Sequence, residues 1–551
     1  MIQKNSRYFS ESLNVVKEFI QSITMVDDKA VFTNGDPVNM AGYFDAGAMI
    51  KNFAEHSIAC SVFKFEEEED IIRIANISQK SDITILDWKM ELSNPIESED
   101  ENELEDDDKE LKGHYTLEIL KRVISSEYNK FKLFVIYTDE IDFNRIVTQI
   151  KGSLTEMNFI CEDESHYSFF CNSNKITIFG KEAVKTKTTH IKEVTERSYS
   201  YDELPEALYA EFVNFTHGVV SNIFLKTITA IRANTYSLLG TFQRDIDAAF
   251  IAHKGLLPIP DDAHEHIVEL IGSEIKSVIG GALRESITNL QIESFVESLD
   301  PKELLFNFDK TGLNNPELIP LGFTIEEFKD LLNKGVVHAC NYNGDTKSKI
   351  ELSKKVIKHL PQIIIKGHNP QIKKSIAESM AKQSHIKFAR LTTVRNRYLD
   401  SNKPILTLGV ILKGRTVSGI DEYWICIQPK CDSVRLADNE NMWQGRSFIF
   451  LSLTKTSNKG EIVLSSNLSF KIEYNIIKSR QFMFRPTKKG MVVVRGNSSD
   501  DWFFLDSFGR RFEYIAELKN DFAQGIANTF ASQVSRVATN HSEWLRLNAS
   551  K

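Results

Sequence analysis

The sequence lacks the features that direct a chain to a membrane or to an oxidising compartment. It has no apolar run of about 18 residues, so we expect no transmembrane helix. Its first residues, MIQKNSRYFSES, lack the basic, apolar and small-residue order of a signal peptide. Only 6 cysteines are scattered over 551 residues, without a Cys-x-x-Cys pair, which argues against a disulfide framework and a zinc knuckle. These absences predict a cytoplasmic protein with reduced thiols and no membrane partner.

The composition also lacks the bias of disordered, collagen-like or coiled-coil chains, because 42% of the residues are hydrophobic and 26% are charged. At roughly 150 residues per domain, the length predicts three or four domains.

Charge is distributed unevenly along the chain. Residues 97–110 (ESEDENELEDDDKE) hold ten acids and one lysine, which accounts for the net charge of −9 of the whole chain. Residues 346–397 carry thirteen Lys or Arg against two Glu. The chain therefore contains an acidic insert and a basic segment.

The first third of the chain alternates short β-branched runs with helical patterns. This rhythm predicts a doubly wound, mostly parallel sheet with helices on both faces. Four predicted strands end in polar residues. The pair Asp27 and Asp28 follows the first, Asp87 follows ITIL, Thr138 follows KLFVIY, and Lys181 closely follows KITIF. Since ligands bind at the carboxyl ends of parallel strands, we expect these side chains to converge on one site.

The residue types at this edge indicate phosphoryl chemistry. Asp27, Asp28 and Asp87 would repel one another, and Mg²⁺ binds such carboxylates together with a phosphoryl oxygen. A carboxylate can attack phosphorus and form an acyl phosphate, whose charge a metal ion and a lysine neutralise. Each element alone is a weak signal, since Asp-Asp is common in solvated turns and a lysine after glycine is often only solvated. Five such residues in the right order, at separate strand ends, are together a strong signal for this kind of site.

Residues 19–183 resemble the receiver domain of bacterial response regulators, which has a flavodoxin-like fold. The resemblance implies that Asp87 is the phosphoacceptor, that Asp27, Asp28 and Asp87 hold Mg²⁺, and that Thr138 and Lys181 bind the phosphoryl group. It also implies a sensor histidine kinase as partner. The protein would then be a phosphoacceptor regulator with slow self-dephosphorylation and not an enzyme.

Several positions depart from the usual receiver pattern. No Met-Pro follows Asp87, no proline follows Lys181, and Ile178 stands where receivers usually have the aromatic residue that reports phosphorylation. These departures argue against a conventional rotamer switch. Lys89 and Glu140 lie two residues after the aspartate and the threonine, where their side chains can pair and obstruct the path of attacking water.

The rest of the chain contains fewer residues whose chemical role can be inferred. We expect a receiver-like domain at 1–190, a helical domain at 200–300, a mixed, basic connecting region at 301–400, and a β-rich domain with a terminal helix at 401–551. The β-rich region contains the runs ILTLGVIL, YWICIQ, SFIFLSL, EIVLS, FKIEY, GMVVVRG and DWFFLD, which predict an antiparallel barrel or sandwich, with helix after Phe512. His217, His264 and His266 match no kinase, phosphotransfer or zinc motif, so surface or packing roles are expected.

The combination of ITILDW, FVIYTDE, DIDAAFIAHKGLLP, QPKCDSVRL and SEWLRL is similar to the stand-alone receiver component of bacterial anti-phage two-component systems. This similarity implies a phosphate sink that competes with a receiver linked to a nucleosidase effector. The alternative is a phosphorylation-controlled output protein that binds nucleic acid or another protein through the basic segment. A third hypothesis places an enzyme site in the β-rich domain. The sequence of that domain contains no Ser/His/Asp set, phosphate loop or metal cluster that would support it.

Overall fold

The computed structural model divides the chain into two compact units, Met1–Ala339 (unit 1) and Cys340–Lys551 (unit 2). It describes residues 6–32, 44–92, 113–126, 131–188, 190–257, 260, 262–286, 289–298, 329, 332–335, 360–362, 364–367, 371–396, 403–416, 418–433, 436, 445–456, 460–488, 490–496 and 501–535. The acidic insert and residues 311–322 (TGLNNPELIPLG), whose turn-forming residues indicate a loop or domain edge, lie outside the described residues.

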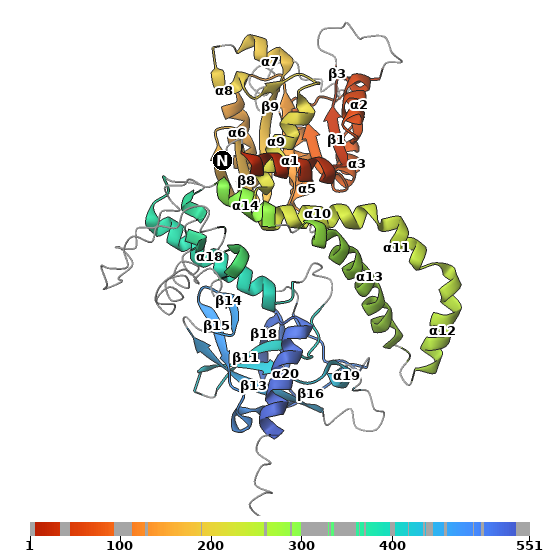
Figure 1. Ribbon diagram of the computed structural model, residues 1–551, viewed down its shortest axis with the longest axis vertical. Coiled ribbons are helices and arrows are strands. Elements are labelled where there is room, and N and C mark those ends of the chain that lie inside the picture. The colour runs from red at the N-terminus through yellow and green to blue at the C-terminus, as the bar shows by residue number, and fades with distance from the viewer. Residues whose placement is uncertain are drawn as a thin grey trace, which may run out of the picture. The chain divides into compact units, whose positions relative to one another are not determined.

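The core of unit 1 is an eight-stranded sheet in the order β4-β1-β5-β6-β9-β8-β7, with β10 also paired to β9 (Figure 1). Its first five strands are parallel: β4 (Ala59–Lys64), β1 (Ser22–Asp27), β5 (Ile83–Leu86), β6 (Leu133–Thr138) and β9 (Asn174–Lys181). The predicted doubly wound parallel sheet is thus confirmed. Beyond it, an unpredicted hairpin extends the edge with β7 (Cys161–Ser165) and β8 (Ser168–Cys171), which run antiparallel.

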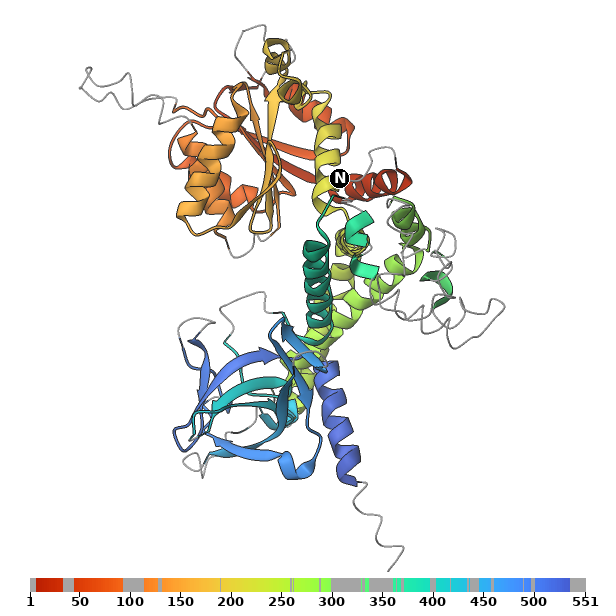
Figure 2. The ribbon, with the colours of Figure 1, turned by 90° about the vertical axis from the view of Figure 1, so that its left-hand side faces the viewer.

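Helices cover both faces of this sheet, because successive strand residues point to opposite sides. Ile23, Ile85 and Val135 face a core formed with α1 (Arg7–Phe19), α2 (Ala46–Glu55) and α9 (Leu204–Thr216). Leu86 and Ile136 face the other core, formed with α3 (Asp70–Ser78), α5 (His114–Ile124) and α6 (Phe143–Glu156). Figure 2 shows the strands between the two helical layers. The short strands β2 (Ala30–Val31) and β3 (Phe44–Asp45) pair with each other. The short helices α7 (Glu182–Lys187) and α8 (Lys192–Thr195) follow β9, and β10 (Ser198–Tyr199) pairs with β9.

Side chains in the sequence set where these helices begin. The Ser6 hydroxyl accepts a hydrogen bond from the Phe9 amide at the start of α1, and the Asp142 carboxylate accepts one from the Arg145 amide at the start of α6.

The region after α9 is helical, as predicted. Its helices are α10 (Val219–Ala233), α11 (Thr235–Thr241), η1 (Arg244–Ile246), α12 (Asp247–Leu256), α13 (Asp262–Ser286) and α14 (Asn289–Glu297).

A buried lysine directly before β6 is expected to make the stability of unit 1 depend on pH. Lys132 is 4% exposed and its ammonium donates to the Ser81 carbonyl oxygen at 2.8 Å. Burial lowers its pKa to about 7. Between pH 7 and 10 the unfolded chain therefore holds a proton that the folded chain has released, so the free energy of unfolding rises with pH, by at most about 1.4 kcal/mol per pH unit.

We expect Lys132→Met to remove this rise and to stabilise unit 1 most at and below about pH 7, where the folded chain must bury the charged ammonium. The measurement is hydrogen exchange of the β6 amides between pH 7 and 10, expressed as an opening free energy. Lys51→Met, at an exposed lysine of α2, serves as the matched control and should keep the wild-type slope. Equal slopes for Lys132→Met and wild type would contradict the assignment.

Unit 2 is built on an antiparallel sheet in the order β14-β15-β13-β12-β11-β18-β17, with β16 also paired to β13. Its strands are β11 (Val410–Arg415), β12 (Asp421–Cys426), β13 (Arg446–Thr456), β14 (Ile462–Ser465), β15 (Leu468–Ile472), β16 (Arg480–Phe484), β17 (Phe503–Leu505) and β18 (Arg511–Glu517). The helices α18 (Lys374–Thr393), α19 (Lys430–Ser433), η4 (Ile476–Lys478) and α20 (Asn520–Ser535) complete it. An isolated bridge joins Phe484 of β16 to Asp506. A β-rich second part is confirmed, and the choice between barrel and sandwich stays a prediction.

Two details of the predicted β-rich region are wrong. The terminal helix begins at Asn520 and not directly after Phe512, because residues 513–517 pair with β11 as part of β18. The run GMVVVRG does not form the predicted strand. Its residues make only isolated bridges, Val493 with Ile405 and Arg495 with Phe503. In the first place pairing with β11 overrides a local helical pattern, and in the second the apolar run finds no continuous partner strand.

Candidate functional site

The five residues predicted from strand ends occupy the carboxyl edge of the parallel sheet. Asp27 is the last residue of β1 and Asp28 follows it, Asp87 follows β5, Thr138 ends β6, and Lys181 ends β9. Strand order places β5 between β1 and β6, so Asp87 lies at the middle of this edge. The convergence follows from parallel pairing, which brings all carboxyl ends to one side.

Lys181 connects two of these carboxylates. Its Nζ atom donates to Asp27 Oδ2 at 2.7 Å and lies 2.9 Å from Asp87 Oδ1. Burial alone would lower the pKa of Lys181, but the charges of Asp87 and Asp27 outweigh it and raise that pKa. The ammonium therefore remains charged and holds together two acids on strands far apart in the sequence.

Asp87 is 4% exposed, and this burial raises its pKa to about 7 against the opposing effect of Lys181. Asp87 Oδ1 has no well-aligned hydrogen bond, whereas Oδ2 accepts one from the Lys89 amide at 3.0 Å. A protonated carboxyl is not a nucleophile, so cationic partners determine whether Asp87 can react near neutral pH.

The backbone beside Asp87 is fixed by a threonine that the sequence did not single out. Thr116, near the start of α5, donates from its hydroxyl to the Asp87 carbonyl oxygen at 2.6 Å. Trp88 lies buried beneath the same helix, and Gly113 has a φ of +91° where a Cβ would come 2.2 Å from the Trp88 ring. Only glycine fits there without moving the tryptophan. No sequence signal identified Thr116, because it lies on the far side of the acidic insert.

A second layer of the site is formed by the loops after β5 and β6. Lys89 Nζ lies 2.7 Å from Glu140 Oε1, and each side chain is about one quarter exposed, at 28% and 26%. The Glu140 amide donates to the Thr138 hydroxyl at 3.1 Å, just as the Lys89 amide contacts Asp87. The predicted pairing of Lys89 with Glu140 is thus present. Ile178, at the position of the missing aromatic residue, is fully buried in the core.

The carboxylate oxygens of Asp27, Asp28 and Asp87 at this edge are of the type that a hard cation binds. Asp28 Oδ1 is buried without a hydrogen-bond partner, and burial together with the charge of Asp27 raises the pKa of Asp28. Within the described ranges, no three His, Cys, Asp or Glu side chains are close enough together to form a metal site. Lys181 lies between Asp27 and Asp87 and supplies the neutralising charge in this arrangement.

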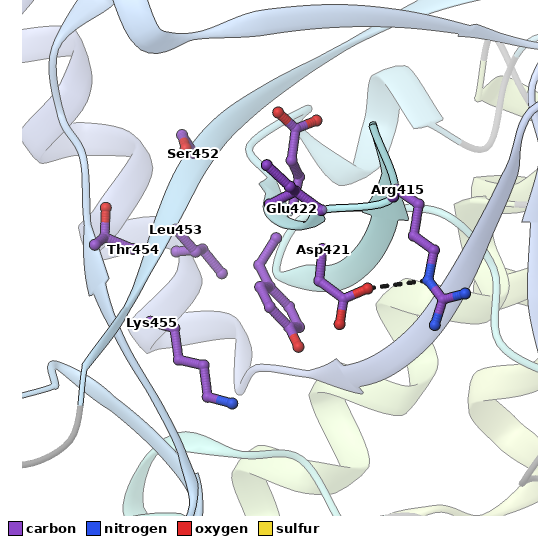
Figure 3. Close-up of a pocket in the computed structure, with 10 residues that line it drawn as sticks. Arg415, Asp421, Glu422, Ser452, Leu453, Thr454 and Lys455 are labelled. Atoms are coloured by element: carbon purple, nitrogen blue, oxygen red, sulfur yellow. Dashed lines mark hydrogen bonds and ion pairs between the residues drawn. The ribbon is translucent and has the colours of Figure 1, made fainter. Parts of the chain in front are cut away.

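Unit 2 has a separate open hollow of about 560 Å³ beside β12 and β13 (Figure 3). Two of its charged side chains are paired with each other, since Arg415 Nε lies 3.1 Å from Asp421 Oδ1. The lining residues include Ser452, Thr454 and Lys455 but neither histidine nor cysteine. The hollow therefore offers no activated nucleophile for the enzyme hypothesis.

None of the helices that the structure describes combines the length and apolar character needed to cross a bilayer.

Comparison with protein families gives a match to the response receiver domain over residues 19–186. Neither a curated protein nor a solved structure matches the chain. The matched segment runs from the end of α1 into α7 and contains all five predicted site residues. The match supports a response receiver domain at residues 19–186 and, in general terms, the phosphoacceptor role of a response regulator.

Proposed function

We propose that the protein accepts a phosphoryl group from a partner sensor histidine kinase onto Asp87. The observation that carries this proposal is the arrangement of Asp27, Asp87 and Lys181 at the ends of three parallel strands within the receiver match. In the proposed step an Asp87 carboxylate oxygen attacks phosphorus. A P–O bond forms as the P–N bond of the phosphohistidine breaks, and the imidazole stays on the kinase.

Neighbouring side chains support this step. Lys181 balances the charge of Asp87 and so favours its ionised, nucleophilic form. Thr138 ends the adjacent strand and presents a hydroxyl that can donate to a phosphoryl oxygen, since at present it accepts from the Glu140 amide. Asp27, Asp28 and Asp87 would hold Mg²⁺. When bound, Mg²⁺ would neutralise charge on the phosphoryl oxygens.

We further propose a phosphate sink in an anti-phage two-component system. The protein would take phosphate that otherwise reaches a receiver-linked nucleosidase effector. Support comes from the sequence similarity and from Ile178, a buried aliphatic residue that provides no aromatic switch for an output signal. In this proposal the protein is an acceptor with slow self-dephosphorylation and acts in the cytoplasm.

The Lys89–Glu140 pair is expected to slow hydrolysis of the acyl phosphate. A partly exposed pair contributes roughly 0–1 kcal/mol to stability, so its effect on water access is steric. We expect Lys89→Ala and Glu140→Ala each to accelerate dephosphorylation several-fold, and a barrier change of ~1.4 kcal/mol would give tenfold. The measurement is the decay of labelled protein after the kinase is removed.

The matched control is Asp139→Ala, because Asp139 lies 4.0 Å from Lys89 Nζ and contributes less to the pair. Decay in this variant should stay near that of wild type. Unchanged or slower decay in both Lys89→Ala and Glu140→Ala would argue against the water-access role.

The sink hypothesis itself is tested in cells. Asp87→Ala should be toxic in a strain that carries intact kinase and effector, even without phage, because phosphate then reaches the effector unopposed. Toxicity should disappear when the kinase is also inactivated. Normal growth with lost protection would instead identify a positive transmitter, the alternative in which the basic segment delivers the output.

A further inference from the structure

Two cysteines face each other across the hairpin at the edge of the unit 1 sheet. Cys161 begins β7 and Cys171 ends β8, and the two residues are partners in the antiparallel ladder. Both are free thiols, and their Sγ atoms lie 3.2 Å apart. Since the S–S bond of a disulfide measures about 2.05 Å, the two sulfur atoms need to approach each other by only about 1 Å to form one.

The backbone holds these two residues at the ladder position that brings side chains closest together. Directly beside the pair, the Asn172 amide donates to the Ile160 carbonyl oxygen at 2.9 Å. Cys161 and Cys171 therefore form a non-hydrogen-bonded pair, whose Cα atoms typically lie ~4.5 Å apart. A disulfide spans Cα separations of about 4.4–6.8 Å, so the strands can stay in place when the bond forms.

The two thiols differ in their access to solvent. Cys161 is partly exposed, whereas Cys171 is fully buried in the core that it shares with Ile176 and Ile178. Burial raises the pKa of the Cys171 thiol, and the hydrogen bond with Cys161 adds to this effect. An oxidant in solution therefore reaches Cys161 first, and Cys171 is placed to complete the bond.

We infer that Cys161 and Cys171 form a reversible redox site, which a low-molecular-weight disulfide such as oxidised glutathione converts from two thiols into one disulfide bond. The Cys161 thiolate attacks one sulfur of the oxidant, whose S–S bond breaks and releases a glutathione thiolate. Cys171 then loses its proton and attacks Cys161 Sγ, which releases the second glutathione thiolate. The protein thus gives up two electrons and two protons, and the oxidant becomes two molecules of reduced glutathione.

A single bridge of this kind is compatible with a reducing compartment, where disulfides are usually transient and redox-sensing. The bridge closes a short loop across β7, an edge strand whose pairing with β8 is interrupted by a register shift between Asp163 and Ser165. Cross-linking the two strands opposes their separation. We therefore expect amide hydrogen exchange in β7 to be at least ~tenfold slower in the oxidised chain than in the reduced chain.

The test treats the full chain with oxidised glutathione, alkylates the remaining thiols and cleaves after glutamate without a reductant. Cleavage after Glu162 or Glu164 places Cys161 and Cys171 on separate peptides, which then stay together only through a disulfide. Mass spectrometry should detect this linked pair, and dithiothreitol should separate it. The readout involves no phosphate, so its outcome is independent of the proposed acceptor function.

Substitutions test the order of the two steps. Cys171→Ala should stop at the mixed disulfide and retain glutathione on Cys161, whereas Cys161→Ser should form neither product and show no slowing of exchange in β7. Far-UV circular dichroism checks that both variants fold. The matched control is Cys431→Ser, at an exposed cysteine of α19, which should form the link as wild type does.

Two results with folded wild type would overturn the proposal. One is glutathione retained on Cys161 without a link to Cys171, which would show that the buried thiol does not complete the bond. The other is the absence of any bond to either cysteine after prolonged oxidation, which would show that the pair is not accessible to the oxidant.

Discussion

Asp87→Asn will reduce phosphate uptake from the partner kinase to background while the fold remains intact. Asparagine keeps the shape of the side chain but removes the oxygen nucleophile that forms the acyl phosphate. Because burial raises the pKa of Asp87 to about 7, a neutral side chain is well tolerated at this position. The measurement is transfer of labelled phosphate from the autophosphorylated kinase, with thermal unfolding as the check on folding.

Asp139→Asn is the matched control for this experiment. Asp139 carries the same functional group in the loop after β6, and its side chain is 45% exposed. Its variant should accept phosphate as wild type does. Labelling that persists in Asp87→Asn, or is lost equally in both variants, would refute Asp87 as the acceptor.

The second large effect concerns the proposed Mg²⁺ site. Asp28→Ala should weaken Mg²⁺ binding at least about tenfold and make phosphate uptake correspondingly poor. Trp88 is buried directly after Asp87, so its fluorescence provides the binding signal. Excess chelator should abolish uptake by wild type, and uptake that proceeds equally in chelator would contradict the metal site.

The same substitution should stabilise the protein when no metal is present. Asp28 is ionised at neutral pH only at a cost, since burial and the charge of Asp27 raise its pKa. The free-energy cost of ionising Asp28 in the folded state grows as the pH rises through its folded pKa. Asp28→Ala removes this cost, so the substitution raises the free energy of unfolding most above that pH. In chelator we therefore expect a higher unfolding temperature for Asp28→Ala than for wild type. Added Mg²⁺ should raise the unfolding temperature of wild type and leave that of the variant almost unchanged.

A Trp88→Phe control separates the signal from binding. The fluorescence change should disappear in this variant, whereas phosphate uptake and stabilisation by Mg²⁺ should persist. A fluorescence change that survives in Trp88→Phe would come from another of the 5 tryptophans.

The sequence alone was sufficient to predict the parallel sheet and the residues along its edge. Strands such as LFVIYT are buried on both faces, so they appear as continuous apolar runs that end where a polar residue appears. Parallel pairing then brings Asp27, Asp87 and Lys181 to the same side whatever the details of packing. The order of the strands along the chain and the hydrophobic pattern are properties of the sequence, and the site prediction was based on them.

The hairpin β7–β8 and the contact of Thr116 with Asp87 could not be predicted in this way. The residues of β7, CEDES, are mostly polar and gain their strand conformation only from pairing with β8. Likewise YIAE near the chain end favours helix locally but pairs with β11 in the tertiary structure. In each case the decisive interaction comes from a segment distant in sequence or from the far side of an insert.

The sequence by itself thus determined which residues lie at the carboxyl edge of the sheet, because the alternation of strands and helices dictates where strand ends meet. The tertiary structure decided how those residues are charged and held. Burial of Asp87, the position of Lys181 between two carboxylates and the pairing of Lys89 with Glu140 depend on distances across strands and loops.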